Sequence, residues 1–574
     1  MFKPKIDKEC LFCGKVFQTT DRAIKEGRGK HCSKLCQSKS ARTGSTKVCE
    51  FCHNTFYANP SMIKAKKCRF CSFNCHIGWK RKNNSLFSGE NSPTWEGGKS
   101  TINATIRASS EYKLWRKAVF ERDNYTCIWC KESNGNGKAI VLNADHIKPF
   151  AFFPELRFEV SNGRTLCADC HKYTASYMGR SKRYFRAPDK FIPRKTRIEY
   201  GGMIIGPEEH DAIFHTVLSQ GGKRWTIGPE SIAFEEELAK EVGVKRAVVV
   251  NSGSSALLIA MTALKLPKGS KVIIPAVNFP TAFNAILQNN LVPLVVDVDI
   301  DTLNLDLDKV KEAMSDEVSA VIAVDIAGNP VDLVKLRGVV GDKVKIILDD
   351  CDGLGGTIDG KYKEVYADVS CVSFHAAHII GLGEGGAVLT DDEDLANTAL
   401  KMREWGRASG TDRIYEYPGF PTDYKERYVY EEIGYNLKPL ELQCAMGRVQ
   451  LKKIGEFKKA RKANFAKLKQ VFDADGRFKT VSYIGDPCWF SFPLLCEGVE
   501  REKVMRVLEE NNIECRTIFS GNITLHPAYK DSAYEVSGTL TNADKVMRDG
   551  MFLSVHPSIT DEMITFIDQV ISKI

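Results

Sequence analysis

Cysteines in the first 80 residues are spaced as metal ligands. They form two sets with the same internal spacing, the second 39 residues after the first: Cys10, Cys13, Cys32 and Cys36, then Cys49, Cys52, Cys71 and Cys75. Four thiolates at such spacings can bind one Zn²⁺ tetrahedrally. Each unit is too short to bury a core, so the metal would supply much of its folding free energy. The repeat therefore predicts two zinc-binding units, over residues 1–40 and 41–80.

Residues suited to phosphodiester hydrolysis lie beside a third cysteine set. Asp145 and His146 end a β-like segment, and Asn162 and His171 follow at the two ends of the segment NGRTLCADCH. Hydrolysis of a phosphodiester needs a base for the attacking water and a cation beside the phosphate. The four cysteines of this set, which we expect to hold a structural zinc, are Cys127, Cys130, Cys167 and Cys170.

This segment resembles a known nuclease domain. Residues 112–183 are similar to the HNH endonucleases, whose ββα-metal fold surrounds one divalent ion. The resemblance implies that His146 is the general base and that Asn162 orients its imidazole. It further implies that Asp145 and His171 bind Mg²⁺ or a similar ion, and that double-stranded DNA is the partner. The two earlier units resemble treble-clef zinc fingers, which bind nucleic acid or protein.

The remainder of the chain alternates helical and strand-like segments. KVIIPAV, PLVVDVD, AVIAVDI and VKIILDD are candidates for buried strands. Such alternation predicts a mostly parallel sheet covered on both faces, with ligands bound beyond the carboxyl ends of its strands. Polar residues stand at those ends: a Gly/Ser turn over residues 251–255, Asp349, and Ser373.

These loops resemble the DegT/DnrJ/EryC1/StrS sugar aminotransferases, which have the fold of type I pyridoxal phosphate enzymes. The similarity runs from about residue 190 to the C-terminus and implies a large domain over 184–435 and a smaller α/β domain over 436–574. It also implies a role for each matching residue. Gly253, Ser254 and Ser373 would bind the cofactor phosphate, Phe279 would stack on the pyridine ring, Asp349 would pair with the pyridinium nitrogen, and Asn436 would reach the neighbouring subunit of a homodimer.

One position departs from the aminotransferase pattern. His378 stands where the family has the lysine that binds the cofactor covalently. An imidazole cannot form that bond, but it can move protons at neutral pH. The departure resembles the 4-keto-6-deoxyhexose 3-dehydrases, which use the pyridoxamine form of the cofactor on a nucleotide-linked sugar. The segment RTIFSGNITLHPAY adds Arg516 and Asn522 as candidate substrate contacts.

The 3-dehydrases that this part of the chain resembles are of two types, one with an iron–sulfur cluster that delivers electrons and one without it. The CDP-sugar enzymes carry an iron–sulfur cluster on four cysteines, of which Cys351 matches the first, whereas the other three positions hold Ser409, Thr411 and Gly419. We therefore expect no iron–sulfur cluster. A route like that of the GDP-sugar enzymes, in which glutamate regenerates the pyridoxamine, fits better, although overall similarity favours the CDP-sugar type. The identity of the nucleotide stays open.

Charge divides the chain at the same place as the motifs. Residues 1–200 hold 39 Lys and Arg against 17 Asp and Glu, and the rest of the chain has a net charge of −13. A basic first part favours a polyanionic partner, and residues 81–111 are interpreted as a basic linker. The chain has no run of about 18 apolar residues and no signal-peptide core, so a cytoplasmic location in a bacterial or phage-infected cell and no membrane partner are expected.

Three function classes follow. The first, which the motifs favour, is a bifunctional chain in which a mobile nuclease is fused to a sugar dehydrase of deoxysugar or lipopolysaccharide biosynthesis. The second is a homing endonuclease with a non-functional enzyme tail. The third is a sugar enzyme of the aminotransferase family whose N-terminal part only binds DNA.

Overall fold

The chain forms two compact units, residues 1–113 and 114–574. The computed structural model describes residues 5–40, 44–64, 68–72, 74–76, 79, 102–134, 139–184, 190–220 and 223–574. Part of the predicted linker, residues 81–101, lies outside the described residues.

The first unit repeats one small motif. Hairpin β1 (Lys5–Glu9)–β2 (Val16–Thr20) precedes α1 (Asp21–Lys25) and α2 (Lys34–Ser40), and hairpin β3 (Ser45–Val48)–β4 (Thr55–Ala58) precedes α3 (Pro60–Lys64). Among its described residues, the buried hydrophobic side chains are Cys10, Cys49 and Ala58. So little apolar burial agrees with units that need another source of stability.

The second unit opens with a hairpin and a short helix, which we term the hairpin module (residues 114–184). After α6 (Ser110–Arg122), strand β5 (Leu142–His146) pairs antiparallel with β6 (Gly163–Cys167), and α7 (Ala168–His171) follows. A side chain at Gly163 would place its Cβ 2.2 Å from Val119, so helix α6 packs directly against this end of the hairpin.

The rest of the second unit, residues 190–574, is termed the sheet body. Its main sheet has eight strands in the order β19-β9-β8-β10-β11-β14-β15-β7, parallel from β19 to β14 and antiparallel at the last two pairings. In chain order they are β7 (Arg246–Val250), β8 (Lys271–Pro275), β9 (Val292–Val296), β10 (Val318–Val324), β11 (Lys345–Asp349), β14 (Val369–Ser373), β15 (Gly386–Thr390) and β19 (Glu535–Val536). The predicted mostly parallel sheet is confirmed.

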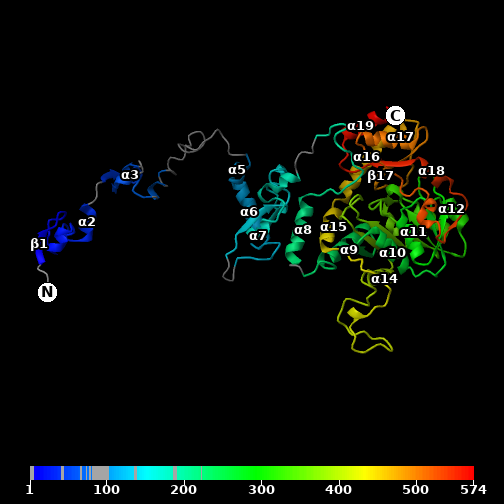
Figure 1. Cartoon of the computed structure of the whole chain (residues 1–574), viewed down its shortest axis with the longest axis horizontal. Coiled ribbons are helices and arrows are strands. Elements are labelled where there is room, and N and C mark those ends of the chain that lie inside the picture. The colour runs from blue at the N-terminus through cyan, green and yellow to red at the C-terminus, as the bar shows by residue number, and fades with distance from the viewer. Residues whose placement is uncertain are drawn as a thin grey trace. The chain divides into compact units, whose positions relative to one another are not determined.

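Helices cover both faces of this sheet (Figure 1). Alternate strand residues enter different cores: in β7, Val248 and Val250 join one cluster, and Ala247 and Val249 join another. This two-sided burial explains why the strands are apolar throughout. The helices are α8 (Pro207–Gln220), α9 (Pro229–Val242), α10 (Gly253–Ala263), α11 (Pro280–Gln288), α12 (Leu307–Ala313), α13 (Leu333–Val340), α14 (Glu393–Arg403) and α15 (Glu441–Leu451).

A smaller α/β layer completes the sheet body. Helix α16 (Ile454–Asp473) leads into a four-stranded antiparallel sheet of order β16-β17-β20-β18. Its strands are β16 (Phe478–Thr480), β17 (Ser491–Cys496), β18 (Arg516–Thr517) and β20 (Gly550–Ser554), and its other helices are α17 (Arg501–Glu510), α18 (Thr541–Asp549) and α19 (Asp561–Ile571). The segment between α14 and α15, in yellow, projects away from the sheet (Figure 1).

The start of α9 is capped from another helix, and this cap supports a prediction. The buried carboxylate of Glu441 accepts hydrogen bonds from the backbone N–H groups of Gly228, Glu230 and Ser231, at 2.8 to 3.0 Å. Glu441→Ala leaves the N–H groups of Glu230 and Ser231 without this acceptor, at a cost of about 2–4 kcal/mol, whereas the Gly228 N–H keeps its bond to the Ser231 hydroxyl at 2.9 Å. We expect a lower melting temperature by calorimetry, whereas replacing the exposed Glu416 with Ala should change nothing. Equal melting of both variants would contradict the role of this cap.

Candidate functional site

A cavity of about 610 Å³ opens at the carboxyl ends of the parallel strands. Its wall includes the turn before α10, the start of α11, the ends of β11 and β14, the loop after β14 and strand β18. The predicted site residues that line it are Gly253, Ser254, Phe279, Asp349, Ser373, His378 and Arg516. The structure thus brings together residues more than 260 positions apart in the chain.

The turn before α10 is built to receive an anion. Ser252 caps the helix by accepting the N–H of Ser255 at 3.1 Å, so the chain enters the helix beside the cavity. At Gly253 an added Cβ would lie 2.8 Å from both Cys351 Sγ and Ser373 Cβ. Only glycine therefore allows this close packing. Backbone N–H groups at a helix start, with the hydroxyls of Ser254 and Ser373 beside them, suit a phosphate group.

Asp349 is a buried carboxyl group at the end of β11. Burial raises its pKa to about 6, although the Cys351 N–H, 3.3 Å from Oδ1, opposes the rise. Among the described side chains, none forms an ion pair with Asp349. Such a group would be stabilised in its charged form by a bound cation, and a protonated ring nitrogen would supply one.

His378 lies on the loop after β14. Burial, together with the neighbouring His375, lowers its pKa to about 3, so the imidazole is neutral at physiological pH. Its ring lies edge-on to Phe490, with centroids 5.3 Å apart, and Nε2 lies 3.7 Å from Asp352 Oδ1. Nδ1 is enclosed, and no described group forms a hydrogen bond to it. Of the described residues that line the cavity, none is a lysine.

The other predicted residues of the sheet body lie differently. Phe279 is half exposed at the start of α11, and the exposed Asn436 accepts a hydrogen bond from Lys438 at 2.5 Å. Arg516 reaches the cavity beside the ring of Tyr200. Asn522 is buried, and its amide bonds to Asp544 and Thr524, so it caps a local turn. No described contact tests the substrate roles of Arg516 and Asn522, which stay predictions.

Sequence reasoning missed several cavity residues, of which Asp352 is the most informative. It follows Asp349 by three positions in the same turn, and burial raises its pKa well above the ordinary value. The run LDDCD could have drawn attention to it, because three carboxyl groups at one strand end are unusual in a buried turn. The further lining residues include Tyr200, Asp325, His375, Glu384 and His526.

The hairpin module brings the four nuclease candidates to one end of its hairpin. Asp145 Oδ1 lies 3.4 Å from His171 Nε2, and the neighbouring Arg164 lowers the pKa of Asp145 to about 2 despite the opposing effect of burial. The ring of His146 stacks on Trp115, with centroids 3.9 Å apart. Asn162 bonds to backbone groups on the 148–156 loop. These contacts leave the predicted roles of His146 and Asn162 untested.

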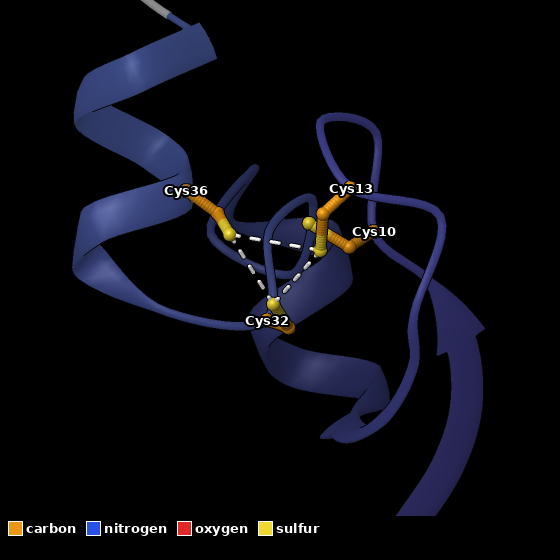
Figure 2. Close-up of side chains that lie close together, drawn as sticks. All are labelled: Cys10, Cys13, Cys32 and Cys36. Carbon is orange, nitrogen blue, oxygen red and sulfur yellow. Dashed lines mark hydrogen bonds between the residues drawn. The ribbon is translucent and has the colours of Figure 1, made fainter.

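Each of the three cysteine sets gathers its sulfur atoms within 4.8 Å of one another. Figure 2 shows the first set, in which Sγ–Sγ distances of 3.5, 3.5 and 3.7 Å link Cys13, Cys32 and Cys36. Four thiolates around a tetrahedral Zn²⁺ lie roughly 3.7 Å apart, given bonds of about 2.3 Å. All three sets can therefore hold a metal ion. Among the described helices, none has the length and apolarity needed to cross a membrane.

The sheet body is similar to known proteins. Residues 207–574 match the DegT/DnrJ/EryC1/StrS aminotransferase family. Lipopolysaccharide biosynthesis protein RfbH of Salmonella typhimurium is 34% identical over 414 residues, which cover 67% of this chain and 93% of that protein. GDP-4-keto-6-deoxy-D-mannose 3-dehydratase of Yersinia pseudotuberculosis is 31% identical over 362 residues, covering 61% and 92%.

Solved structures agree. The E. coli GDP-4-keto-6-deoxy-D-mannose 3-dehydratase with bound hydrated PLP superposes with a TM-score of 0.61 at 29% identity, and covers 65% of this chain and 100% of that one. A GDP-4-keto-6-deoxymannose 3-dehydratase with a trapped PLP–glutamate geminal diamine superposes equally well, with 65% and 99% coverage. The sheet body therefore has the type I fold of pyridoxal phosphate enzymes.

The raised pKa of Asp349 predicts a pH-dependent stability. A carboxyl group whose pKa is raised on folding destabilises the fold above that pKa, and the penalty disappears as the pH falls towards its unfolded value near 4. Asp349→Asn should therefore stabilise the ligand-free chain at pH 7.5, by up to about 3 kcal/mol, and much less at pH 4.5. Thermal melting at both pH values, with the exposed Asp423→Asn as control, checks this. Destabilisation at pH 7.5 would contradict it.

Proposed function

Because the chain belongs to the DegT/DnrJ/EryC1/StrS aminotransferase family, we propose that its sheet body removes the 3-hydroxyl group of a nucleotide-linked 4-keto-6-deoxyhexose. The reaction would use pyridoxal 5′-phosphate and its pyridoxamine form, with glutamate as the amino donor. One observation carries the proposal: His378 lines the cavity, whereas no lysine is among its described lining residues. The similarity to two 3-dehydratase structures, one of them with glutamate joined to PLP, supports both sugar and donor.

The cavity residues fit this cofactor. Gly253, Ser254 and Ser373 would hold its phosphate, Phe279 would cover its ring, and Asp349 would keep its ring nitrogen protonated. When bound, the cofactor supplies an electron sink for the carbon next to its amine. The burial of Asp349 makes this pairing stronger than it would be in water.

His378 would move the proton. Its imidazole is uncharged at neutral pH because the cavity disfavours the cationic form. Since Nδ1 is enclosed, we assign proton transfer to Nε2, which lies beside Asp352. A neutral imidazole can accept a proton from a carbon acid and deliver it to a leaving hydroxyl group. Arg516, at the mouth of the cavity, would contact the substrate.

The iron–sulfur positions carry a polar network instead. The hydroxyl groups of Ser409 and Thr411 both donate to Glu426, which also pairs with Arg413. Oxygen ligands of this kind do not suit an iron–sulfur cluster. This network supports a route without an external reductase, as in the GDP-sugar enzymes.

We further propose that the active form is a homodimer. The projecting segment between α14 and α15 exposes Tyr417, Tyr428, Tyr430 and Ile433, the last of them 92% exposed. Several exposed apolar side chains on one projecting segment favour an interaction surface there. Asn436, at the end of this segment, would then reach the partner's cavity.

Substitution at position 378 tests the proposed chemistry. We expect no covalent cofactor on the wild-type chain after borohydride reduction, because no lysine of the described cavity wall can bind it. His378→Lys should add one cofactor per chain by intact mass and abolish 3-dehydration. Glu416→Lys places a lysine at an exposed position outside the cavity, so it is the control and should add none. A cofactor attached to the wild-type chain would refute the histidine-based mechanism and favour ordinary transamination.

A second candidate function concerns the hairpin module, and one observation favours it. In its support, Asp145, His146 and His171 lie at one end of the hairpin, with a tetrathiolate set beside them. We propose a metal-dependent endonuclease with Mg²⁺ or a similar ion on Asp145 and His171. The three cysteine sets would bind structural Zn²⁺, and the two N-terminal units would contact double-stranded DNA.

Cleavage assays separate the remaining alternatives. His146→Ala should abolish Mg²⁺-dependent nicking or cutting of plasmid DNA, because the general base is removed, and should leave sugar turnover unchanged. DNA binding without cleavage by the wild-type chain would contradict the nuclease and leave a DNA-binding N-terminal part. Cleavage without sugar turnover would instead indicate a nuclease with a non-functional enzyme tail.

A further inference from the structure

Helix α8, the first element of the family match, is buried on two opposite faces. Glu209 and Asp211 are both buried, yet positions two residues apart in a helix point about 200° apart. The carboxylate of Glu209 accepts hydrogen bonds from Gln450 at 2.7 Å and from Lys453 at 2.6 Å, inside the sheet body. Asp211 therefore faces away from that body.

Asp211 faces the hairpin module and joins a buried charge network there. Its Oδ2 accepts a hydrogen bond from Arg164 Nη2 at 2.6 Å, and its Oδ1 accepts the N–H of Ala175 at 2.7 Å. The same edge of the Arg164 guanidinium also bonds to Asp145, with Nε 2.9 Å and Nη2 2.8 Å from Oδ2. His210 Nδ1 lies 3.2 Å from Asp211 Oδ1. Arg164 thus has one carboxylate from its own module and one from α8.

Aromatic and charged contacts surround this network. The rings of Phe214 and Tyr173 stack with centroids 6.1 Å apart, and His215 lies 5.6 Å from Trp129. At the edge, Lys148 of the module pairs with Glu208 of α8. The outer face of α8 therefore presents acidic and aromatic groups that match basic and aromatic groups of the module.

Arg164 contributes most to the cost of separating the hairpin module from α8. Its guanidinium is almost completely enclosed, and an enclosed ion is stable only when paired and fully hydrogen-bonded. Separation from α8 would leave it with a single carboxylate and would also expose the Ala175 N–H. Undocking therefore disturbs both the module and α8.

We propose that the outer face of α8 is a docking surface for the hairpin module, anchored by Asp211, and that the module and the sheet body open as one cooperative unit. The partner of this surface is the chain's own hairpin module, residues 114–184. This interface does not depend on either proposed catalytic activity, so a chain that lacked one of the activities would still form it.

Hydrogen exchange of the full chain tests the docking. Asp211→Asn keeps the shape of the side chain but removes its charge, and we expect amide exchange in β5, β6 and α8 to rise at least about tenfold. Asp169→Asn is the matched control, because its carboxylate is exposed on α7 and pairs with Lys172 of the same module. It should leave exchange unchanged. A rise on one side of the interface only, or none, would overturn the proposal.

If Asp211→Asn fails to fold, cross-linking of the unaltered chain tests the same docking. A carbodiimide should join Lys148 to Glu208 with loss of one water, and peptide mass spectrometry should detect the linked pair. The Lys265–Glu432 ion pair lies within the sheet body and serves as the internal reference. A cross-link at the reference pair without one at Lys148–Glu208 would overturn the docking.

Discussion

A fully enclosed ammonium group connects the strand ends on which the cavity is built. Lys363 Nζ lies 2.7 Å from Asp325 Oδ2 and also pairs with Asp350, and all three side chains are shielded from solvent. Breaking such a pair would leave an uncompensated charge in a medium of low polarity, so the three groups cannot move apart. Asp325 follows β10 and Asp350 follows β11. The turn that carries Asp349 and Asp352 therefore takes its position from this contact.

The same low polarity sets the protonation states at the cavity in opposite senses. It disfavours the anion of Asp349 and the cation of His378, so it raises one pKa and lowers the other. A buried carboxyl group without a cation, Asp349, lowers the stability of the empty protein. The same group binds a positively charged ligand strongly, and the neutral His378 does not repel that ligand. The site thus gives up stability in the free protein for strength of binding, as functional sites commonly do.

Much of the sheet body could be predicted because its signals are local. Apolar runs that end in Asp349 or Ser373 mark parallel strands, and the carboxyl ends of such strands meet at one edge. Gly253 follows the same logic, since its neighbours leave no room for a side chain. The grouping of the cysteines into three sets could also be predicted, because metal-ligand spacing is a property of the sequence itself.

What could not be predicted depends on contacts distant in the chain. The amide of Asn522 is taken by Asp544, from a helix 22 residues later, and nothing in the local segment indicates that pairing. Arg164 and Asp211 are 47 residues apart and belong to segments with different family resemblances. Motif reading treats such segments separately, so it predicts two independent halves and overlooks the ion pair between them.

The docking surface also gives physical meaning to the charge division of the chain. Helix α8 begins PEEHD, and acidic side chains near a helix N-terminus are favoured by the helix dipole whatever surrounds them. Glu209 bonds inside the sheet body and Asp211 bonds on the outer face, whereas Glu208, at the edge, lies near both Lys453 and Lys148. The outer face of α8 is therefore negatively charged, and Arg164 and Lys148 of the basic module pair with its carboxylates. The acidic side chains at the start of α8 therefore stabilise both the helix and its contact with the hairpin module.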